Sequence, residues 1–312
     1  MNEMRDRQGE GPLPLPTRRP DEFRTLSSAI SVEFAARSHP GTRPANEDHY
    51  HVLRMGRHQE TLATSLPDGE VPARFDEAGY GIIVADGLGT VGTGETASRL
   101  AISTFAHLAL HFGKWNVRID PRTADEVIQR GLRFYQTINE RVTEAGRENP
   151  ELAGMGTTLT VAYIADDTLF IGHVGHSRAY LLRDSKLTLL TRDQTLAQRV
   201  DAGGHPLTEL AAHDLGHILT DAIGGRAGSP SIQIGRIRLQ HDDCLLLCTN
   251  GLTDVVDDQG VKAILLEPGG LDERCEALID LALARGATDN VTAVVAKYCV
   301  PGGPVRGSIT HL

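Results

Sequence analysis

The feature that most constrains the fold of this chain is a succession of short β-type runs that begins at Ile30. Each run is flanked by Gly, Asp or Asn residues, and runs of this length between such residues favour strands joined by tight turns. The predicted strands span residues 31–36, 80–85, 157–164, 168–174, 178–182, 186–190, 232–239, 244–248 and 291–298.

Three other stretches carry apolar residues at three- and four-residue steps, which is typical of amphipathic helices. They span residues 95–112, 123–144 and 271–285. In the second stretch, Thr123 and Glu126 have the spacing of a capping box, which predicts that a helix starts there. The helices are grouped between runs of strands and do not alternate with single strands. The pattern therefore indicates an α+β fold of antiparallel sheets covered by helices.

Composition limits the class of partner. The chain has 312 residues, with 41 acidic and 31 basic side chains and a formal charge of −10. This charge would repel a phosphate backbone, so nucleic acid is not an expected partner. No apolar run approaches the roughly 18 residues that span a bilayer, and no secretory signal is visible, so we expect no membrane partner. Four cysteines without paired C-x-x-C spacing fit a reducing compartment, and the expected location is the cytoplasm.

The first part of the chain differs in composition from the rest. Residues 1–28 hold four prolines among Gly, Arg and Glu residues, with too little apolar surface to offset the entropy of ordering. We expect these residues to form a disordered N-terminal extension. One domain is expected over residues 29–299, followed by a C-terminal tail at residues 300–312.

Residues 82–94 run from an apolar strand into a glycine-rich loop that contains a G-x-G-x-x-G pattern at Gly87, Gly89 and Gly92. A dinucleotide-binding turn would also need a second parallel strand with an acidic residue about 20 positions further on. This region continues as a helix instead, which disfavours that interpretation. The alternative is that Asp86 is a metal ligand at the end of a strand, with the carbonyl of Gly87 free to coordinate.

The remaining polar motifs are ordinary loops and turns when each is considered alone, but together they follow a specific order. The chain resembles protein phosphatase 2C over roughly residues 31–298. That family has an Arg with Asn-Glu-Asp, then Val-Ala-Asp-Gly, Gly-Glu-x-Ala-Ser, Gly-Thr-Thr, Gly-Asp-Ser-Arg, Ser-Asp-Gly and Asp-Asn. The corresponding residues here are Arg43 with Asn46-Glu47-Asp48, Val84-Ala85-Asp86-Gly87, Gly94-Glu95-Thr96-Ala97-Ser98, Gly156-Thr157-Thr158, Gly175-His176-Ser177-Arg178, Thr249-Asn250-Gly251 and Asp289-Asn290.

The resemblance implies a four-layer sandwich of two packed antiparallel sheets flanked by helices, with a two-metal site at one end. It also implies a water between two Mn²⁺ or Mg²⁺ ions that attacks phosphoserine or phosphothreonine directly. Asp86 is then expected to bridge both metals and Gly87 to offer its carbonyl. Asp289 is expected to ligate one metal, and Arg43 to hold the phosphate. Glu47 and Asp48 are expected to hold metal-bound waters.

Two carboxylates of the family pattern are replaced in this chain. Asn250 occupies the position of the Ser-Asp-Gly aspartate, which is a direct metal ligand in the family. His176 occupies the position at which bacterial members have an Asp that binds a third, weaker metal. An amide oxygen can coordinate a hard cation but brings no charge, so metal binding is expected to weaken. Imidazole suits softer transition metals, so the third site is expected to be absent or altered.

Two functions follow from these residues. The first is a metal-dependent serine/threonine phosphatase that acts on phosphorylated proteins of a serine/threonine kinase pathway, because Asp86, Asp289 and Arg43 are all present. The second is a pseudophosphatase that binds a phosphoprotein or regulatory partner without efficient catalysis, which is suggested by Asn250 and His176.

Overall fold

The computed structural model describes residues 25–300, except residues 91, 114–117, 205–207 and 226–227. The expected N-terminal extension and C-terminal tail lie almost entirely outside the described residues. Where they overlap, Leu26–Ala29 form the short helix α1, and the backbone N–H of Val300 donates to His241 Nδ1 at 3.0 Å.

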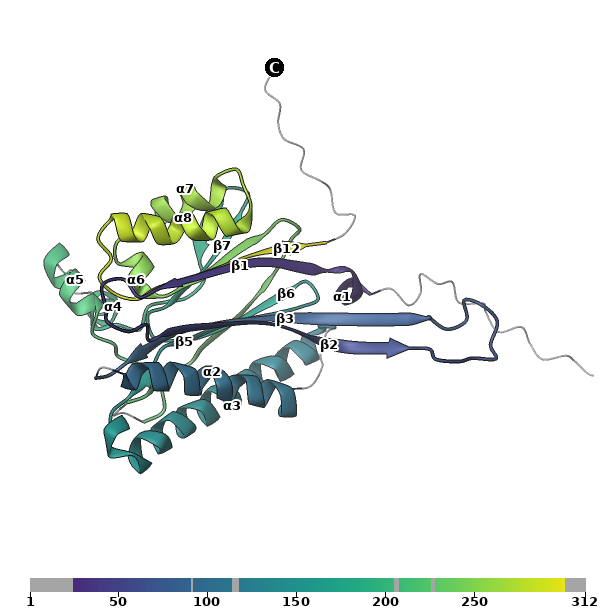
Figure 1. Ribbon diagram of the computed structural model, residues 1–312, viewed down its shortest axis with the longest axis horizontal. Helices are drawn as coiled ribbons and strands as arrows, with labels where there is room; N and C mark the ends of the chain where they lie inside the picture. Colours follow the sequence, from purple (N-terminus) through teal and green to yellow (C-terminus); the bar gives the residue numbers. More distant parts are fainter. Residues whose placement is uncertain (1–24, 91, 114–117, 205–207, 226–227, 301–312) are drawn as a thin grey trace, which may run out of the picture.

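Two antiparallel sheets make up the centre of the fold (Figure 1). The first sheet has the order β1 (Ser31–His39), β12 (Val291–Cys299), β11 (Cys244–Cys248), β7 (Arg178–Arg183) and β8 (Lys186–Leu189). The second has the order β10 (Gln233–Arg238), β6 (Thr168–Val174), β5 (Leu159–Ala165), β3 (Arg74–Leu88), β4 (Gly156–Thr157) and β9 (Ile223–Gly224), and β2 (Asp48–Glu60) pairs with β3. Each strand predicted from the sequence lies in one of these sheets.

Alternation along the strands divides the core into layers. Ile82 and Val84 of β3 face the other sheet and pack with Leu245 and Leu247 of β11. Ile83, between them in sequence, faces outward into a separate cluster with the helices. Because both faces of these strands are buried, their sequences are continuous apolar runs without polar alternation.

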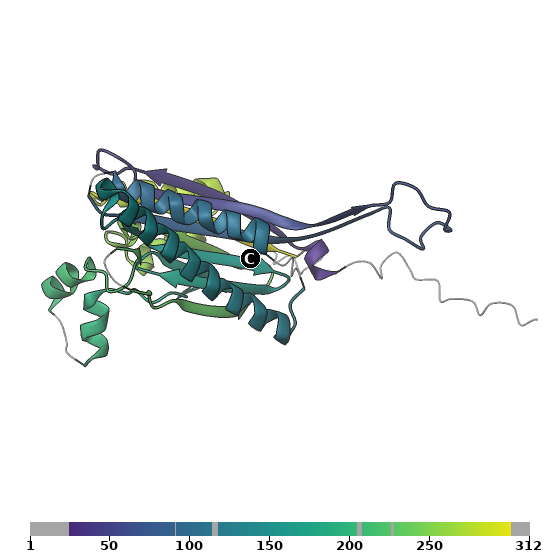
Figure 2. The ribbon, with the colours of Figure 1, turned by 90° about the horizontal axis from the view of Figure 1, so that it is seen from below.

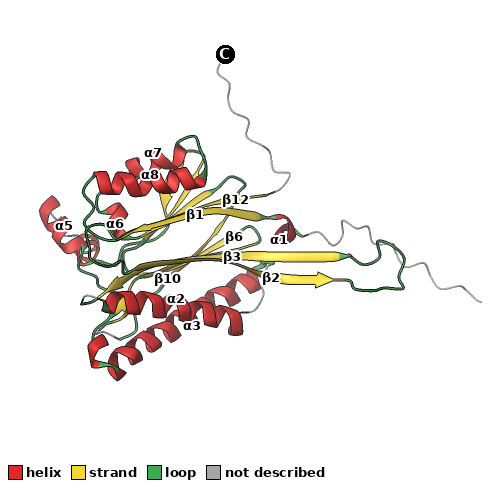
Figure 3. Ribbon diagram, in the orientation of Figure 1, coloured by secondary structure: helices red, strands yellow, loops and turns green. Residues whose placement is uncertain are grey.

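Helices cover the outer face of each sheet (Figure 3). The helices α2 (Thr93–Phe112) and α3 (Pro121–Glu148) pack on the second sheet through a cluster that includes Ala97, Ala101 and Ile138. The helices α7 (Asp258–Leu266) and α8 (Leu271–Ala284) pack on the first sheet through Val261 and Leu278. The α+β class and the four-layer arrangement are confirmed. None of the described helices is long and apolar enough to cross a membrane.

The start of α3 differs from the predicted capping box. The helix begins at Pro121, and Asp120 is its N-cap, whose carboxylate accepts from the backbone N–H of Thr123 at 2.7 Å. An Asp at the N-cap followed by Pro at the first helical position satisfies the start of a helix, so Thr123 lies inside the first turn. The predicted N-cap, Thr123, was wrong by three residues.

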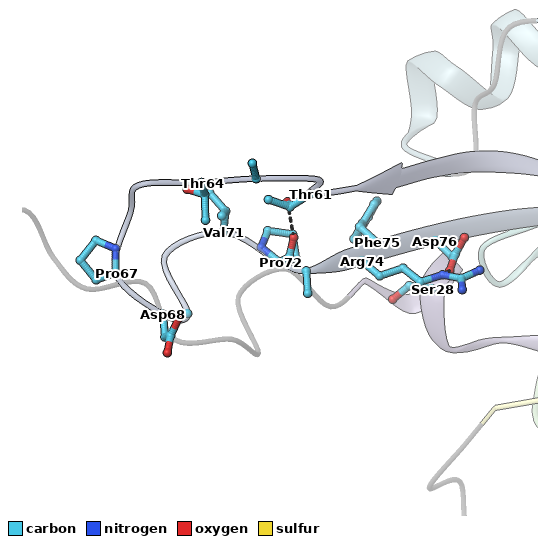
Figure 4. Close-up of a pocket in the computed structure, with 13 residues that line it drawn as sticks. Ser28, Thr61, Thr64, Pro67, Asp68, Val71, Pro72, Arg74, Phe75 and Asp76 are labelled. Atoms are coloured by element: carbon cyan, nitrogen blue, oxygen red, sulfur yellow. Dashed lines mark hydrogen bonds and ion pairs between the residues drawn. The ribbon is translucent and has the colours of Figure 1, made fainter.

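A long arm formed by β2 and β3 was not predicted. The two strands pair from Asp48 opposite Asp86 to Glu60 opposite Arg74, whereas β5 covers β3 only from Gly79 to Val84. The rest of the hairpin therefore projects from the sandwich (Figure 2). The loop that joins the strands encloses a hollow of about 700 Å³, which is lined by Thr61, Pro67 and Phe75 among others (Figure 4).

A buried carboxylate anchors the base of this arm. The side chain of Glu77 is fully buried and forms ion pairs with Arg57 and Arg118, the second at 2.9 Å. Thr25 Oγ1 also donates to it at 2.9 Å. Burial raises the pKa of Glu77, but the hydrogen bonds from Arg57, Thr25 and Arg118 outweigh burial and lower it overall. The cluster ties the arm to the segment before α1 and to the segment between α2 and α3.

We expect Glu77→Gln to lower the free energy of unfolding at pH 7 by about 1–3 kcal/mol, because it removes the charge that both arginines bind. Since the folded-state pKa of Glu77 is lowered, its stabilisation is present above the unfolded pKa of about 4.5 and is lost as the pH falls through the folded value. Urea unfolding should therefore show a difference in the free energy of unfolding between Glu77→Gln and wild type at pH 7 that becomes smaller at acid pH. Glu60→Gln, at an exposed position of the same arm, should have no such effect.

Candidate metal and phosphate site

The predicted site residues meet at the end of the sandwich opposite the projecting arm, where β2 begins and β3 ends (Figure 1). Asp48 and Asp86 are directly opposite each other in this antiparallel pair. Because opposing residues of neighbouring strands lie close together, the register itself sets two carboxylates side by side.

Asp48 is buried and Asp86 is nearly so, with 14% of its side chain exposed, and their contacts do not compensate their charge. Asp48 Oδ2 accepts from Thr249 Oγ1 at 2.7 Å, but Asp48 Oδ1 has no hydrogen-bond partner. Burial raises the pKa of Asp48 to about 7. Burial, followed by repulsion from Asp48 and Asp289, raises the pKa of Asp86 well above its ordinary value. Two buried carboxylates that repel each other, with one free oxygen, form a donor set that fits a hard divalent cation.

Glycines let the end of β3 pass close to the start of α2. A Cβ on Gly87 would lie 2.2 Å from the carbonyl oxygen of Gly94, so only glycine fits at this crossing. Glu47 lies beside it, and its carboxylate accepts from the backbone N–H of Gly92 at 2.8 Å, just before α2 begins. A carboxylate at this position is stabilised by the start of the helix.

The predicted phosphate clamp contacts a predicted metal ligand. Arg43 Nε and Nη2 donate to the two carboxylate oxygens of Asp289, at 3.1 and 3.2 Å. Both side chains are partly exposed, at 58% for Arg43 and 42% for Asp289. This two-pronged geometry is the one in which a guanidinium also holds a phosphoryl group. Arg43 is thus placed at the rim of the site with a bidentate anion already in its fork.

Asn290 holds the loop that carries Arg43. Its Nδ2 donates to the carbonyl oxygens of Pro40 and Ala45, both at 2.9 Å, and its Oδ1 accepts from the backbone N–H of Glu47 at 2.7 Å. This amide therefore uses its donors and its acceptor on one segment of backbone. The Asp-Asn motif was noted in the sequence, but this positioning role was not predicted.

Asn250 lies at the first position of the short helix α6 (Asn250–Thr253), directly after β11. An Asn-Gly pair favours a hairpin turn, but here tertiary packing overrides that preference. A Cβ on Gly251 would lie 2.0 Å from the carbonyl oxygen of Asn290, so the glycine allows α6 to approach the start of β12. The side chain of Asn250 is buried, and its Nδ2 donates to Asp254 Oδ2 at 2.8 Å.

His176 lies beside Asp86. Its Nδ1 is 3.9 Å from Asp86 Oδ2 and has no hydrogen-bond partner, although the residue is buried. Burial lowers the pKa of His176 to about 4, so the ring is neutral at pH 7. The position that carries an Asp in the resembled family thus contributes no charge to this site.

A residue from another part of the chain completes the cleft. The helices α4 (Leu196–Ala202) and α5 (Glu209–Gly216) form a flap that stands out from the same end of the sandwich as the site (Figure 2). His217, which follows α5, lines the cleft, and its Nδ1 is 3.6 Å from Asp254 Oδ2. His217 was not among the predicted site residues, because nothing in the sequence links the flap to Asp254.

The cleft has a volume of about 360 Å³ and is lined by Arg43, Glu47, Asp86, Gly87, His176, His217, Asn250 and Asp289 among others. Asp48 is not part of this lining. Within the described residues, no three His, Cys, Asp or Glu side chains already converge on a single metal position. Asp289 pairs with Arg43 and Glu47 with the backbone of Gly92, so both carboxylates are turned toward donors of the protein itself.

Comparison with known proteins identifies relatives of this arrangement. The family model of protein phosphatase 2C matches residues 70–268. The serine/threonine protein phosphatase PstP of Mycobacterium tuberculosis is 35% identical over 216 residues, which cover 69% of this chain but only 40% of that relative. The serine/threonine phosphatase stp of Listeria welshimeri is 31% identical over 217 residues, which cover 69% of this chain and 83% of that relative.

Solved structures agree with these relatives. The catalytic domain of PstP in complex with two manganese ions is similar over 86% of this chain and 99% of that domain, with a TM-score of 0.66 and 31% identity. A bacterial serine phosphatase has a TM-score of 0.70 and 26% identity, over 88% of this chain and all of that one.

Proposed function

The chain belongs to the protein phosphatase 2C family, and on this premise we propose that it is a metal-dependent protein serine/threonine phosphatase that works in the cleft around Asp86. The observation that carries the proposal is the pair of Asp48 and Asp86, which lie opposite each other on neighbouring strands, with Asp86 lining a cleft that Arg43 also lines. Its substrates would be phosphorylated proteins of a serine/threonine kinase pathway.

The donor set fits two Mn²⁺ or Mg²⁺ ions, since it consists almost entirely of hard oxygen atoms. Asp86, Asp289, Asn250 and the carbonyl of Gly87 would hold the ions directly, and Glu47 and Asp48 would hold them through water. When bound, two such ions lower the pKa of a water molecule and neutralise phosphate charge. The similarity to the manganese-bound PstP domain supports this assignment.

The protein itself contributes orientation and charge. Arg43 can exchange the carboxylate of Asp289 for the phosphoryl group of the substrate, because each offers two anionic oxygens that a guanidinium binds with two parallel hydrogen bonds. Thr249 holds Asp48 by one oxygen only, which leaves the other available. Asn290 keeps the Arg43 loop folded over the cleft.

The second candidate is a pseudophosphatase that binds a phosphoprotein without efficient catalysis. It is favoured by Asn250 and His176, which together take two negative charges away from the family's pattern. Arg43 would still recognise a phosphate in such a protein.

Turnover of a phosphothreonine peptide across a Mn²⁺ titration into the millimolar range tests the proposal. We expect activity that rises with Mn²⁺ and saturates only at high concentration, because Asn250 supplies no charge to the cation. Isothermal titration calorimetry without peptide should give a matching dissociation constant. Saturable Mn²⁺ binding with no turnover would support the pseudophosphatase, and no Mn²⁺ binding at all would overturn the metal site.

A further inference from the structure

Asn250 is an unusual choice for a residue that faces cations, because its side chain has two different ends. The amide oxygen can coordinate a cation, whereas the amide nitrogen carries two hydrogens that would repel one. A carboxylate at the same position would serve equally in either orientation. The usefulness of Asn250 therefore depends on what fixes the rotation of its amide group.

The structure assigns that task to Asp254, and we propose that Asp254 is a positioning residue that holds the amide oxygen of Asn250 toward the cleft. This inference rests on the proposed function. Asp254 Oδ2 accepts from Asn250 Nδ2 at 2.8 Å. An ionised carboxylate only accepts hydrogen bonds, so the nitrogen of Asn250 must face Asp254. The oxygen then faces the opposite way.

The location of Asp254 separates this role from direct ligation. Asn250 is buried and lines the cleft together with Asp86 and Asp289. Asp254 lies one helical turn further on, is about one-third exposed, and is not among the residues that line the cleft. Its carboxylate thus contacts Asn250 from outside the set of residues that line the cleft.

The flap supports the same carboxylate. His217 Nδ1 lies 3.6 Å from Asp254 Oδ2, the oxygen that also accepts from Asn250. His217 follows α5, and the base of the flap is fixed by hydrogen bonds from Leu196 N to Ile218 O and from Thr220 N to Gln194 O, both at 2.8 Å. The side chains His217, Asp254 and Asn250 therefore form a continuous path from the flap to the cleft.

Mn²⁺ affinity, measured by calorimetry without substrate, tests the positioning role. Outer partners of a metal ligand change affinity by about 10–100-fold when removed. We expect Asp254→Ala to weaken Mn²⁺ binding by about tenfold. This is the lower end of that range, because the site is partly solvated. Asp254→Asn keeps an acceptor oxygen for Asn250 and should bind Mn²⁺ within about threefold of wild type. Asp257→Asn removes one charge nearby, keeps an N-cap acceptor for α7, and is the control for long-range charge.

The Asn250→Asp background gives the sharpest comparison. A carboxylate at position 250 has two equivalent oxygens, so adding Asp254→Ala there should change Mn²⁺ affinity by less than about twofold. If Asp254→Asn binds Mn²⁺ as weakly as Asp254→Ala does, the charge of Asp254 acts directly on the cation and the positioning role is wrong. If neither variant changes Mn²⁺ binding, the inference fails while the proposed function stands. Absence of Mn²⁺ binding in the wild type would instead defeat the proposed function.

Discussion

Asp86→Ala should abolish phosphatase activity, with a loss of about 10³-fold or more at saturating Mn²⁺. The expected size follows from the several kcal/mol that metal ions contribute to such reactions, since each 1.36 kcal/mol corresponds to a factor of ten. Asp86 lines the cleft, and the negative charges of Asp48 and Asp289 both act on its carboxylate. Asp86 is the only carboxylate that the last part of β3, residues 78–88, contributes. Steady-state turnover of a phosphothreonine peptide gives the measurement.

A companion variant, Asp86→Asn, should separate this role from a purely structural one. Without metal, the site disfavours a charged carboxyl at Asp86, because of desolvation and of repulsion from Asp48, so the amide should raise the melting temperature. With Mn²⁺, wild type should have the higher melting temperature of the two, because Mn²⁺ binding stabilises only the protein that keeps the carboxylate.

The control for Asp86→Asn is Asp243→Asn. Asp243 is also buried, but it is paired with Arg183 at 2.5 Å. Its loss should lower the melting temperature and leave the stabilisation by Mn²⁺ intact. Wild-type turnover in Asp86→Ala, or an unchanged response to Mn²⁺ in Asp86→Asn, would show that the reaction centre lies elsewhere.

Much of the fold was readable because buried strands and amphipathic helices carry strong local signals. The apolar runs around Ile82 and Leu245 need no partner to be recognised, because both faces of these strands are covered. The outer half of β2 carries no such signal, since it pairs only with β3 and is largely exposed. A two-stranded arm in solvent can be polar throughout, and its length could not be predicted from hydrophobicity.

The site divides along a similar line. The motif order brought Arg43, Asp86 and Asp289 together correctly, because each sits where a strand or turn of the sandwich ends. Asp254 could have been found, since it stands four positions after Asn250 on a short helix. His217 could not, because its approach depends on how the flap packs. The pairing of Arg43 with Asp289 also needed coordinates, since 246 positions separate the two residues.

Asn250→Asp should lower the dissociation constant for Mn²⁺ by about tenfold, which corresponds to about 1.4 kcal/mol, and raise turnover most at limiting Mn²⁺. The added carboxylate supplies a negative charge with almost no change in size. The neighbouring Asp254 should change this gain by less than about twofold, because a carboxylate at position 250 needs no partner to orient it. Calorimetry and activity at low and saturating Mn²⁺ measure both effects.

The swap Asn250→Asp with Asp254→Asn keeps the net charge of wild type. The amide of residue 254 can then donate to the new carboxylate, so the swap should bind Mn²⁺ at least as tightly as Asn250→Asp alone. Tight binding by the swap would mean that the position of the charge, and not its total, sets metal affinity. If the wild type is inert and Asn250→Asp restores turnover, the pseudophosphatase gains support. Unchanged Mn²⁺ affinity in a folded Asn250→Asp protein would show that residue 250 does not face the cations, because a full negative charge at a ligand position cannot leave cation binding untouched.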